Sequence, residues 1–115
     1  MPRAKGGVKA RKRHKKWLEV SKGFQGAANN VYKKSREQGE RALAEAYRGR
    51  KRRKRDFRTL WIIRIGAAVR QYGLSYSAFI GKLKEKNITL DRKSLSEMAI
   101  TSPEQFEQLV KQVNS

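Results

Sequence analysis

Apolar residues recur at helical spacing in the second half of the chain and almost nowhere else. One stripe, at spacings of four, four, three and four residues, consists of Phe57, Trp61, Ile65, Ala68 and Tyr72. Such spacing places residues on one face of a helix, and Gly73 stands where a left-handed residue commonly ends one. The pattern predicts a helix that ends at Tyr72, and it makes Trp61 and Tyr72 core residues rather than ligand-binding ones.

Three shorter helices are predicted after this stop. Ser75 and Asp91 stand at N-cap positions ahead of apolar residues. Ser102 and Gln105 have the spacing of a capping box, with Pro103 at the first helical position. The residues expected to face inward are Phe79, Ile80, Leu83, Leu95, Met98, Ala99, Phe106, Leu109, Val110 and Val113. Together with the preceding helix, these segments predict a compact helical domain near the lower size limit for independent folding.

The beginning of the chain has no comparable stripe. Residues 1–16 are rich in Lys and Arg and contain the pair Gly6-Gly7, which disfavours a helix, so we expect an extended or frayed tail. The cations of this tail could follow a nucleic-acid backbone and become ordered only on contact. A short apolar patch at residues 17–20 precedes Lys22–Gly26, where two glycines around Phe24 predict a tight turn.

A long helix is expected from Ala27 to about Arg48, and it should run on through the following basic residues to Tyr72. Its first part has too few apolar positions to define a core, so we expect a binding partner rather than protein packing to support it. Gly39 and Gly49 are predicted weak points or bends in this helix.

These patterns predict an all-α fold in two parts. Residues 1–56 are expected to form a basic extension, a long tail followed by an extended helix, and residues 57–115 a small compact helical domain. The distribution of charge supports the division. Residues 1–60 hold 21 Lys or Arg against 5 Asp or Glu, a net charge of +16, whereas residues 61–115 hold 8 against 5, a net charge of +3. The basic part therefore needs a partner of opposite sign.

Six consecutive cations, Arg50–Arg55, identify the partner most directly. On a helix six residues go right round the axis, so no face is left to pack on a protein core. Like charges four residues apart also oppose the isolated helix by roughly a few tenths of a kcal/mol per pair. Phosphate groups would remove that repulsion and pair with Arg bidentately. We therefore hypothesise that this segment becomes helical when it binds a nucleic acid.

Other chemistry is disfavoured by what the sequence lacks. Without cysteine there is no disulfide, thiolate zinc site or catalytic thiol. There is no glycine-rich phosphate loop, no cluster of His and carboxylates and no nucleophile with a nearby base, so we expect no enzyme activity, no cofactor and no metal. His14, alone in the tail, is interpreted as a polar or stacking contact rather than a metal ligand. Phe24 could stack on a base or cover the apolar patch, and the sequence leaves both open.

A membrane surface is the competing anionic partner. It is disfavoured because the chain has no apolar run near about 18 residues, no recognisable signal peptide, and no broad apolar helix face in its basic half. A cationic membrane-active domain is therefore the weakest of the alternatives.

Four segments carry a resemblance to a known family. They are RKRHKKWLEVSKGFQG, AYRGRKRRKRDFRTLWIIRI, AAVRQYGLSYSAFI and LDRKSLSEMAI. They are similar to the bacterial-type large-subunit ribosomal protein twenty family, and the likeness runs from about Pro2 to Val113. Two places depart from it: residues 27–30 (AANN), where the family is usually richly basic, and Gly49, where an Asp is common.

The resemblance implies an all-helical constituent of the large ribosomal subunit. Such proteins bind large-subunit ribosomal RNA (rRNA) directly, support early subunit assembly, and in some members repress their own messenger RNA. Neighbouring large-subunit proteins are then further partners, and the location is the large ribosomal subunit, cytoplasmic or organellar. The alternative from the charge alone is a nucleoid or histone-like DNA-compacting protein.

The residues expected to bind rRNA are the cations of the tail, the glycine turn, the long helix and the domain, with His14 and Phe24. They are Arg3, Lys5, Lys9, Arg11, Lys12, Arg13, His14, Lys15, Lys16, Lys22, Phe24, Lys33, Lys34, Arg48, Arg50, Lys51, Arg52, Arg53, Lys54, Arg55, Arg58, Arg64, Arg70, Arg92 and Lys93. Most of these contacts should be to phosphate and sugar, so that RNA shape rather than base sequence is recognised.

Overall fold

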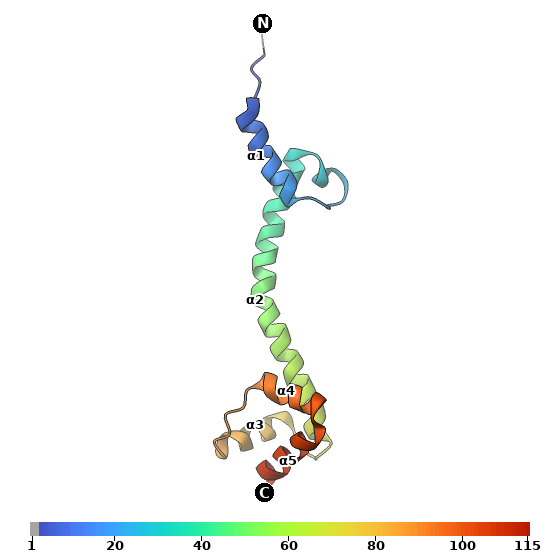
Figure 1. The fold of residues 1–115 in the computed structure, drawn as a ribbon, viewed down its shortest axis with the longest axis vertical. Coiled ribbons are helices and arrows are strands. Elements are labelled where there is room, and N and C mark those ends of the chain that lie inside the picture. Colours follow the sequence, from blue (N-terminus) through green and yellow to red (C-terminus); the bar gives the residue numbers. More distant parts are fainter. Residues whose placement is uncertain (1–2) are drawn as a thin grey trace. The chain divides into compact units, whose positions relative to one another are not determined.

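The computed structural model describes residues 3–115, which form helices joined by short connections and contain no strand. In chain order the helices are α1 (Gly7–Val20), a short 3-10 helix η1 (Gly26–Asn29), α2 (Tyr32–Arg70), α3 (Tyr76–Glu85), α4 (Arg92–Thr101) and α5 (Pro103–Asn114) (Figure 1). The predicted all-α fold is confirmed. By its internal contacts the chain divides into two units, Met1–Lys51 and Arg52–Ser115, and α2 contributes residues to both.

The prediction of an extended tail is wrong for most of its length. Residues 1 and 2 of that predicted tail lie outside the described residues; of residues 3–16, only residues 3–6 lack regular structure, and α1 begins at Gly7. The glycine pair therefore stands at the N-terminal end of the helix rather than inside it, and Gly7 has a positive φ of 70°. The residues that follow are mainly Ala, Lys and Arg, which favour helix, and the C-terminal end of α1 packs against α2.

Two buried serines join α1 to α2 in the first unit. The hydroxyls of Ser21 and Ser35 are hydrogen-bonded to each other, and Ser35 Oγ also donates to the carbonyl of Trp17 at 2.9 Å. Both serines are fully buried. Because a buried hydroxyl is costly without a partner, these bonds fix the position of the turn after α1 against the first turn of α2.

Gly39 is a packing position rather than the weak point predicted for it. A Cβ built on Gly39 would lie 3.0 Å from Trp17 Cε3 and 3.4 Å from Val20 Cγ1. The absence of a side chain lets the indole ring of Trp17 rest on the backbone of α2. The expectation that only a binding partner supports this part of α2 is therefore wrong for its first turns. Gly49 has no atom near its missing Cβ, and α2 runs through both glycines without a break.

The beginning and end of α2 differ slightly from the prediction. Residues 26–29 form the short 3-10 helix, so α2 starts at Tyr32 rather than Ala27. It ends at Arg70, two residues earlier than predicted, and Gly73 has the expected positive φ, 76°. Between these ends the six cations Arg50–Arg55 are helical throughout.

The second unit has an apolar core built from the last turns of α2 and the three short helices. Phe79 and Phe106 meet at its centre, with ring centroids 5.9 Å apart and planes tilted by 50°. The buried apolar residues are Ile65, Val69, Phe79, Leu83, Leu95, Phe106, Val110 and Val113. The residues predicted to face inward from the short helices agree with this core. Six of them are buried in it, and the other four pack against it partly buried: Ile80, Met98, Ala99 and Leu109.

Two of the three predicted helix caps form as expected. The side chain of Ser75 accepts a hydrogen bond from the backbone N–H of Ala78, and that of Asp91 from Ser94. Ser102 makes no side-chain cap, so the predicted capping box is wrong, although Pro103 does stand in the first turn of α5. Ser102 is also the last residue of the α4 turn, with its N–H bonded to the Met98 carbonyl and a ψ of 69°. Because Ser102 belongs to the ends of both helices, its ψ differs from the extended value, near 160°, that Ser75 and Asp91 adopt.

Trp61 was predicted to be a core residue, and the structure corrects this. The apolar stripe of α2 is buried only from Ile65 onward: Phe57 is 44% exposed, and Trp61 is half-buried and outside the core cluster. Tyr72 is also half-buried but does pack against the core. The helix therefore leaves the core at Trp61, one turn before Ile65.

The predicted boundary between residues 56 and 57 stays a prediction, because packing alone does not test which residues fold independently. In the part of the chain that the structure describes, no helix is both long enough and apolar enough to cross a membrane.

Candidate nucleic-acid interface

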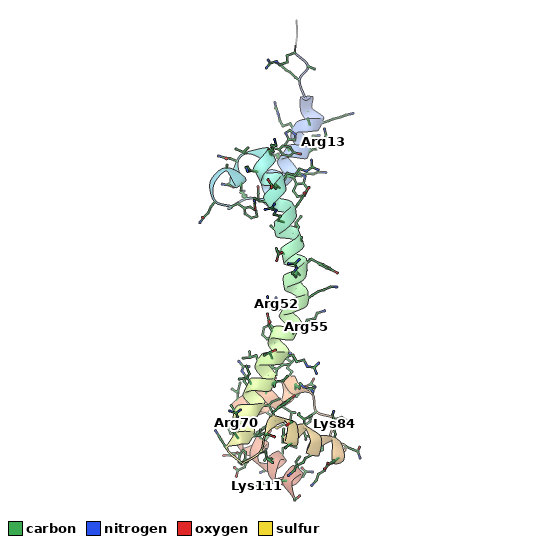
Figure 2. The ribbon with its side chains drawn as sticks, turned by 180° about the vertical axis from the view of Figure 1, so that it is seen from behind. Arg13, Arg52, Arg55, Arg70, Lys84 and Lys111 are labelled. Carbon is green, nitrogen blue, oxygen red and sulfur yellow. The ribbon has the colours of Figure 1, made fainter. Side chains whose placement is uncertain are left out.

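The middle of α2 is the most strongly cationic surface of the chain. Every side chain from Arg50 to Arg55 is exposed, and Figure 2 shows Arg52 and Arg55 extending away from the helix axis. Because the six residues surround the helix, an anionic partner could contact this segment from more than one side. Burial of apolar side chains does not stabilise this segment of the helix, because all six side chains are exposed.

Few acidic groups offset these cations. Arg52 lies 3.9 Å from Asp56, and Arg48 lies 3.0 Å from Glu45, both as exposed ion pairs. Exposed pairs contribute little to stability and exchange readily for other partners. Lys51 lies over the ring of Tyr47, 4.7 Å from its centroid, and Arg53 lies 5.7 Å from that of Phe57. Most of the positive charge is therefore available to a ligand.

The cations of α1 form a second group, in the first unit. Arg11, Lys12, Arg13, Lys15 and Lys16 are all exposed, and Figure 2 shows Arg13 on this helix. His14, on the same helix, stacks on the ring of Tyr32 from α2, with centroids 3.7 Å apart and planes at 19°. His14 therefore makes a stacking contact within the protein, and its predicted contact with RNA stays a prediction.

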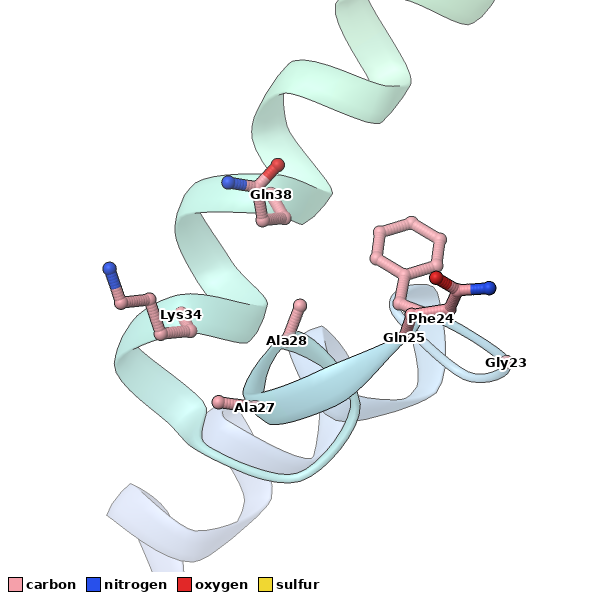
Figure 3. A pocket seen from close by; sticks show the side chains of 7 residues that line it. All are labelled: Gly23, Phe24, Gln25, Ala27, Ala28, Lys34 and Gln38. Atoms are coloured by element: carbon pink, nitrogen blue, oxygen red, sulfur yellow. The ribbon is translucent and has the colours of Figure 1, made fainter.

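Phe24 lies half-buried at an open hollow between the turn and α2. The hollow has a volume of about 580 Å³ and is also lined by Gly23, Gln25, Ala27, Ala28, Lys34 and Gln38 (Figure 3). Figure 3 shows the Phe24 ring and the Lys34 side chain on opposite sides of this hollow, with the ammonium directed away from the ring. The turn itself is held by the N–H of Gly23, which donates to Asn29 Oδ1 at 3.3 Å.

The second unit carries a smaller set of cations. Arg58, Arg64, Arg70 and Lys93 are exposed, whereas Arg92 is half-buried, and its Nε donates to Tyr76 Oη at 2.7 Å. Arg92 is therefore fixed in position, and its remaining N–H groups can serve a ligand.

The structure thus exposes nearly all of the residues predicted to bind RNA. Of the 25, only His14, Phe24 and Arg92 are half-buried. It brings one group together beside an aromatic ring, because Arg58, Arg92 and Lys93 line a hollow with Trp61. Lys34 and Phe24 line another hollow from opposite sides. The place of Trp61 beside these cations was missed because its stripe position resembles that of a core residue.

Three cations that were not predicted to bind RNA, Lys86, Arg36 and Lys111, have partners within the chain. Lys86 Nζ donates to the carbonyls of Gln112 and Ser115 at 2.6 and 2.7 Å, so it satisfies groups at the end of α5. The ion pair with Glu107, at 2.8 Å, raises the pKa of Lys111. The hydrogen bond to Glu40 likewise raises the pKa of Arg36. The spacing of four residues within the last two pairs is visible in the sequence.

The chemistry available is that of binding. Among residues 3–115, no three His, Asp or Glu side chains gather in a way that could hold a metal ion. Exposed cations on helices, with a few half-exposed rings, are typical of a nucleic-acid-binding protein.

Comparison with known proteins identifies the family. Residues 3–109 match the family described as "Ribosomal protein L20". The "Large ribosomal subunit protein bL20" of Mesoplasma florum is 54% identical over 110 residues, which cover 96% of this chain and 92% of the relative. The protein of the same name from Chloroflexus aurantiacus is 50% identical, and the match covers 100% of this chain and 97% of that relative. The one from Rickettsia prowazekii is 51% identical, and the match covers 97% of this chain and 96% of that relative. The chain belongs to the ribosomal protein L20 family.

Membership confirms the family resemblance seen in the sequence. The chain is a structural constituent of the large subunit of the cytoplasmic ribosome and not an enzyme. The DNA-compacting alternative is not favoured.

Proposed function

We propose that the exposed cations of α1 and of the middle of α2 bind rRNA directly and hold RNA segments together during early assembly of the large subunit. The observation that carries this proposal is the run Arg50–Arg55, helical, exposed on every side and paired with little acidic charge. Phosphates brought close by RNA folding repel one another. A helix that presents cations around its whole circumference can lie between two RNA segments and neutralise both.

The second unit supplies a different contribution. From residue 61 onward its net charge is only +3, and its core is apolar, so it can present Arg64, Arg70, Arg92 and Lys93 from a rigid surface. We expect this unit to dock on a folded RNA junction and to select it by shape. The same surface would bind the protein's own message if that RNA forms a similar junction, and neighbouring ribosomal proteins would contact its remaining faces.

Binding across a salt series tests the proposal. The full chain is titrated with an rRNA fragment that contains a junction and with duplex DNA of equal length. If about 6–10 phosphates are neutralised, affinity should fall by roughly 10³–10⁵ between 50 and 200 mM salt. Replacing Arg52, Arg53 and Arg55 with Gln should make the salt dependence shallower.

Selectivity decides between the two candidate functions. One RNA fragment should keep measurable binding at the higher salt while DNA loses it. Equal weakening of RNA and DNA would instead mark a general polyanion binder. In the same samples, amide exchange at residues 50–55 tests the coupled-folding hypothesis, because slow exchange without RNA would contradict it.

A further inference from the structure

Two adjoining hollows lie between the second half of α2 and α4, and Trp61 and Lys93 belong to both. One has a volume of about 220 Å³ and includes Arg64, Ser96 and Glu97 in its wall. The other has a volume of about 230 Å³ and extends toward Arg58, Asp91 and Arg92. Each volume is several times the roughly 30 Å³ that a water molecule occupies in the liquid, so there is room for a planar ring.

Trp61 presents an aromatic surface to these hollows. It is half-buried and stands outside the apolar core, although it lies only one helical turn from the fully buried Ile65. A tryptophan that is anchored but not covered offers a flat, apolar surface of fixed orientation. Unstacked nucleobases commonly bind to such surfaces in RNA-binding proteins.

The charges around Trp61 favour an anionic ligand. Arg58, Arg64 and Lys93 are exposed at the rim, and Arg92 is held by Tyr76. Two carboxylates are also present. That of Asp91 caps α4, whereas Glu97 lines the hollow beside Trp61 and can accept hydrogen bonds from base N–H groups. The cations can therefore bind phosphates while Glu97 faces the base.

Ser96 provides an independent indication that a polar ligand is missing. Its side chain is 1% exposed and lies in the wall of the hollow, yet its Oγ has no hydrogen-bond partner within the described chain. Nearly all buried hydroxyls in proteins have a partner, and the exceptions call for an explanation. A serine hydroxyl rotates about a single bond, so it can turn to a polar atom that enters beside Trp61.

We propose that this site binds one unpaired RNA nucleotide, with its base stacked on Trp61. Ser96 and Glu97 hydrogen-bond the edge of the base, and Arg58, Arg64 and Lys93 bind the phosphates on either side. The proposal rests on the proposed rRNA-binding function and specifies the RNA that is bound. The second unit then selects RNA in which one base is extruded from the RNA helix. A continuous duplex offers no such base.

A pair of RNA hairpins that differ in a single bulged nucleotide tests the proposal. Binding of each hairpin to the full chain is measured by fluorescence anisotropy of labelled RNA, at a salt concentration where phosphate binding alone is weak. The unchanged chain should bind the bulged hairpin roughly tenfold to a hundredfold more tightly, the range expected for stacking of one base. Trp61→Leu should abolish this preference, and Trp61→Phe, which keeps a ring, should retain part of it.

Two further variants separate stacking from general effects on folding. Tyr47→Leu removes an exposed ring of the first unit, outside both hollows, and should leave the preference for the bulge unchanged. Ser96→Ala removes the unpartnered hydroxyl without changing the packing, so it should fold normally and reduce the preference severalfold. Thermal unfolding followed by circular dichroism checks each variant.

Fluorescence locates the contact. The chain has two tryptophans, so Trp17→Phe leaves Trp61 as the one indole reporter, and the bulged hairpin should quench it more than the paired hairpin does. A folded Trp61→Leu chain that keeps the preference would overturn the proposal. So would Trp61 emission that the bulged hairpin leaves unchanged, the result expected if the hollow receives a protein segment instead. Failure of the unchanged chain to bind either hairpin at any salt concentration would overturn the proposed rRNA binding itself.

Discussion

The two halves of α2 show how one helix can serve opposite purposes. Residues 50–58 are exposed without exception, and eight of the nine turn a polar side chain to solvent, whereas Ile65 and Val69 are completely buried. The first segment has no core to stabilise it, and like charges within it repel. The second is stabilised by packing. Because helix propagation is easier than nucleation, the packed turns can support the charged turns that precede them.

The largest effect should come from removing the centre of the packed half. Phe79→Ala deletes a completely buried ring that meets Phe106, and such changes cost about 3–5 kcal/mol. The second unit should then be largely unfolded at 37 °C, and any helicity that residues 50–58 have without RNA should be reduced as well. Circular dichroism and amide exchange measure the two effects. Phe57→Ala, at a ring that is 44% exposed, should cost less than about 1 kcal/mol.

A smaller effect is expected where polar contacts replace a core, at the junction of α1 and α2. Ser35→Ala leaves the buried Ser21 hydroxyl without its main partner, which should destabilise the docking of α1 by about 1–3 kcal/mol. Amide exchange in α1 should become faster while that in α5 stays unchanged. The double variant Ser21→Ala/Ser35→Ala should recover part of the loss, since no unpaired hydroxyl then remains.

Two glycines of α2 allow a matched comparison of packed and free positions. Alanine at Gly49 meets no atom and should stabilise the helix by about 1 kcal/mol. Alanine at position 39 has the same advantage over glycine in helix propensity, but its Cβ would lie 3.0 Å from the Trp17 side chain. We therefore expect Gly39→Ala to be less stable than Gly49→Ala, and thermal unfolding measures the difference. Equal stabilisation of the two would show that Trp17 does not rest on Gly39.

The smallest effect concerns the cap of α4 and depends on pH. Hydrogen bonds from Ser94 hold the pKa of Asp91 below its ordinary value of 3.8. A carboxyl group with a lowered pKa in the folded chain stabilises it fully above that ordinary value, and the stabilisation is lost as pH falls through the folded pKa. Asp91→Asn keeps a capping oxygen but cannot titrate. The free energy of unfolding, measured with urea from pH 6 down into the acid range, should therefore depend slightly less on pH in the variant than in the unchanged chain.

Local signals in the sequence predicted the second unit well. The caps at Ser75 and Asp91, the stop at Gly73 and the buried faces of the short helices depend on residues within a few positions of one another. The error at Ser102 has a specific cause. Its sequence is that of a capping box, but the residue also closes α4, and that second constraint sets its backbone angle.

The first unit was harder to predict because its contacts join distant residues. Nothing near Ser21 in the sequence shows that its partner is Ser35, 14 residues away, and nothing near Gly39 shows that Trp17 covers it. The glycine pair at residues 6 and 7 was taken as evidence against a helix when it stands at a helix end. Trp61 was misassigned because periodicity gives the face of a helix but not how far along it the core extends.

The positions of the two sets of contacts also bear on the order of events during synthesis. The contacts described above that join α1 and its turn to α2 lie between residues 14 and 39, whereas the core of the second unit is complete only when Val113 has been made. At about 5–20 residues per second, the 76 residues that follow Gly39 take roughly 4–15 s to synthesise. A nascent chain therefore presents its cationic half for several seconds before the second unit can fold. If the second unit selects the RNA site, as proposed, that selection can begin only when the last residues of the core have been made.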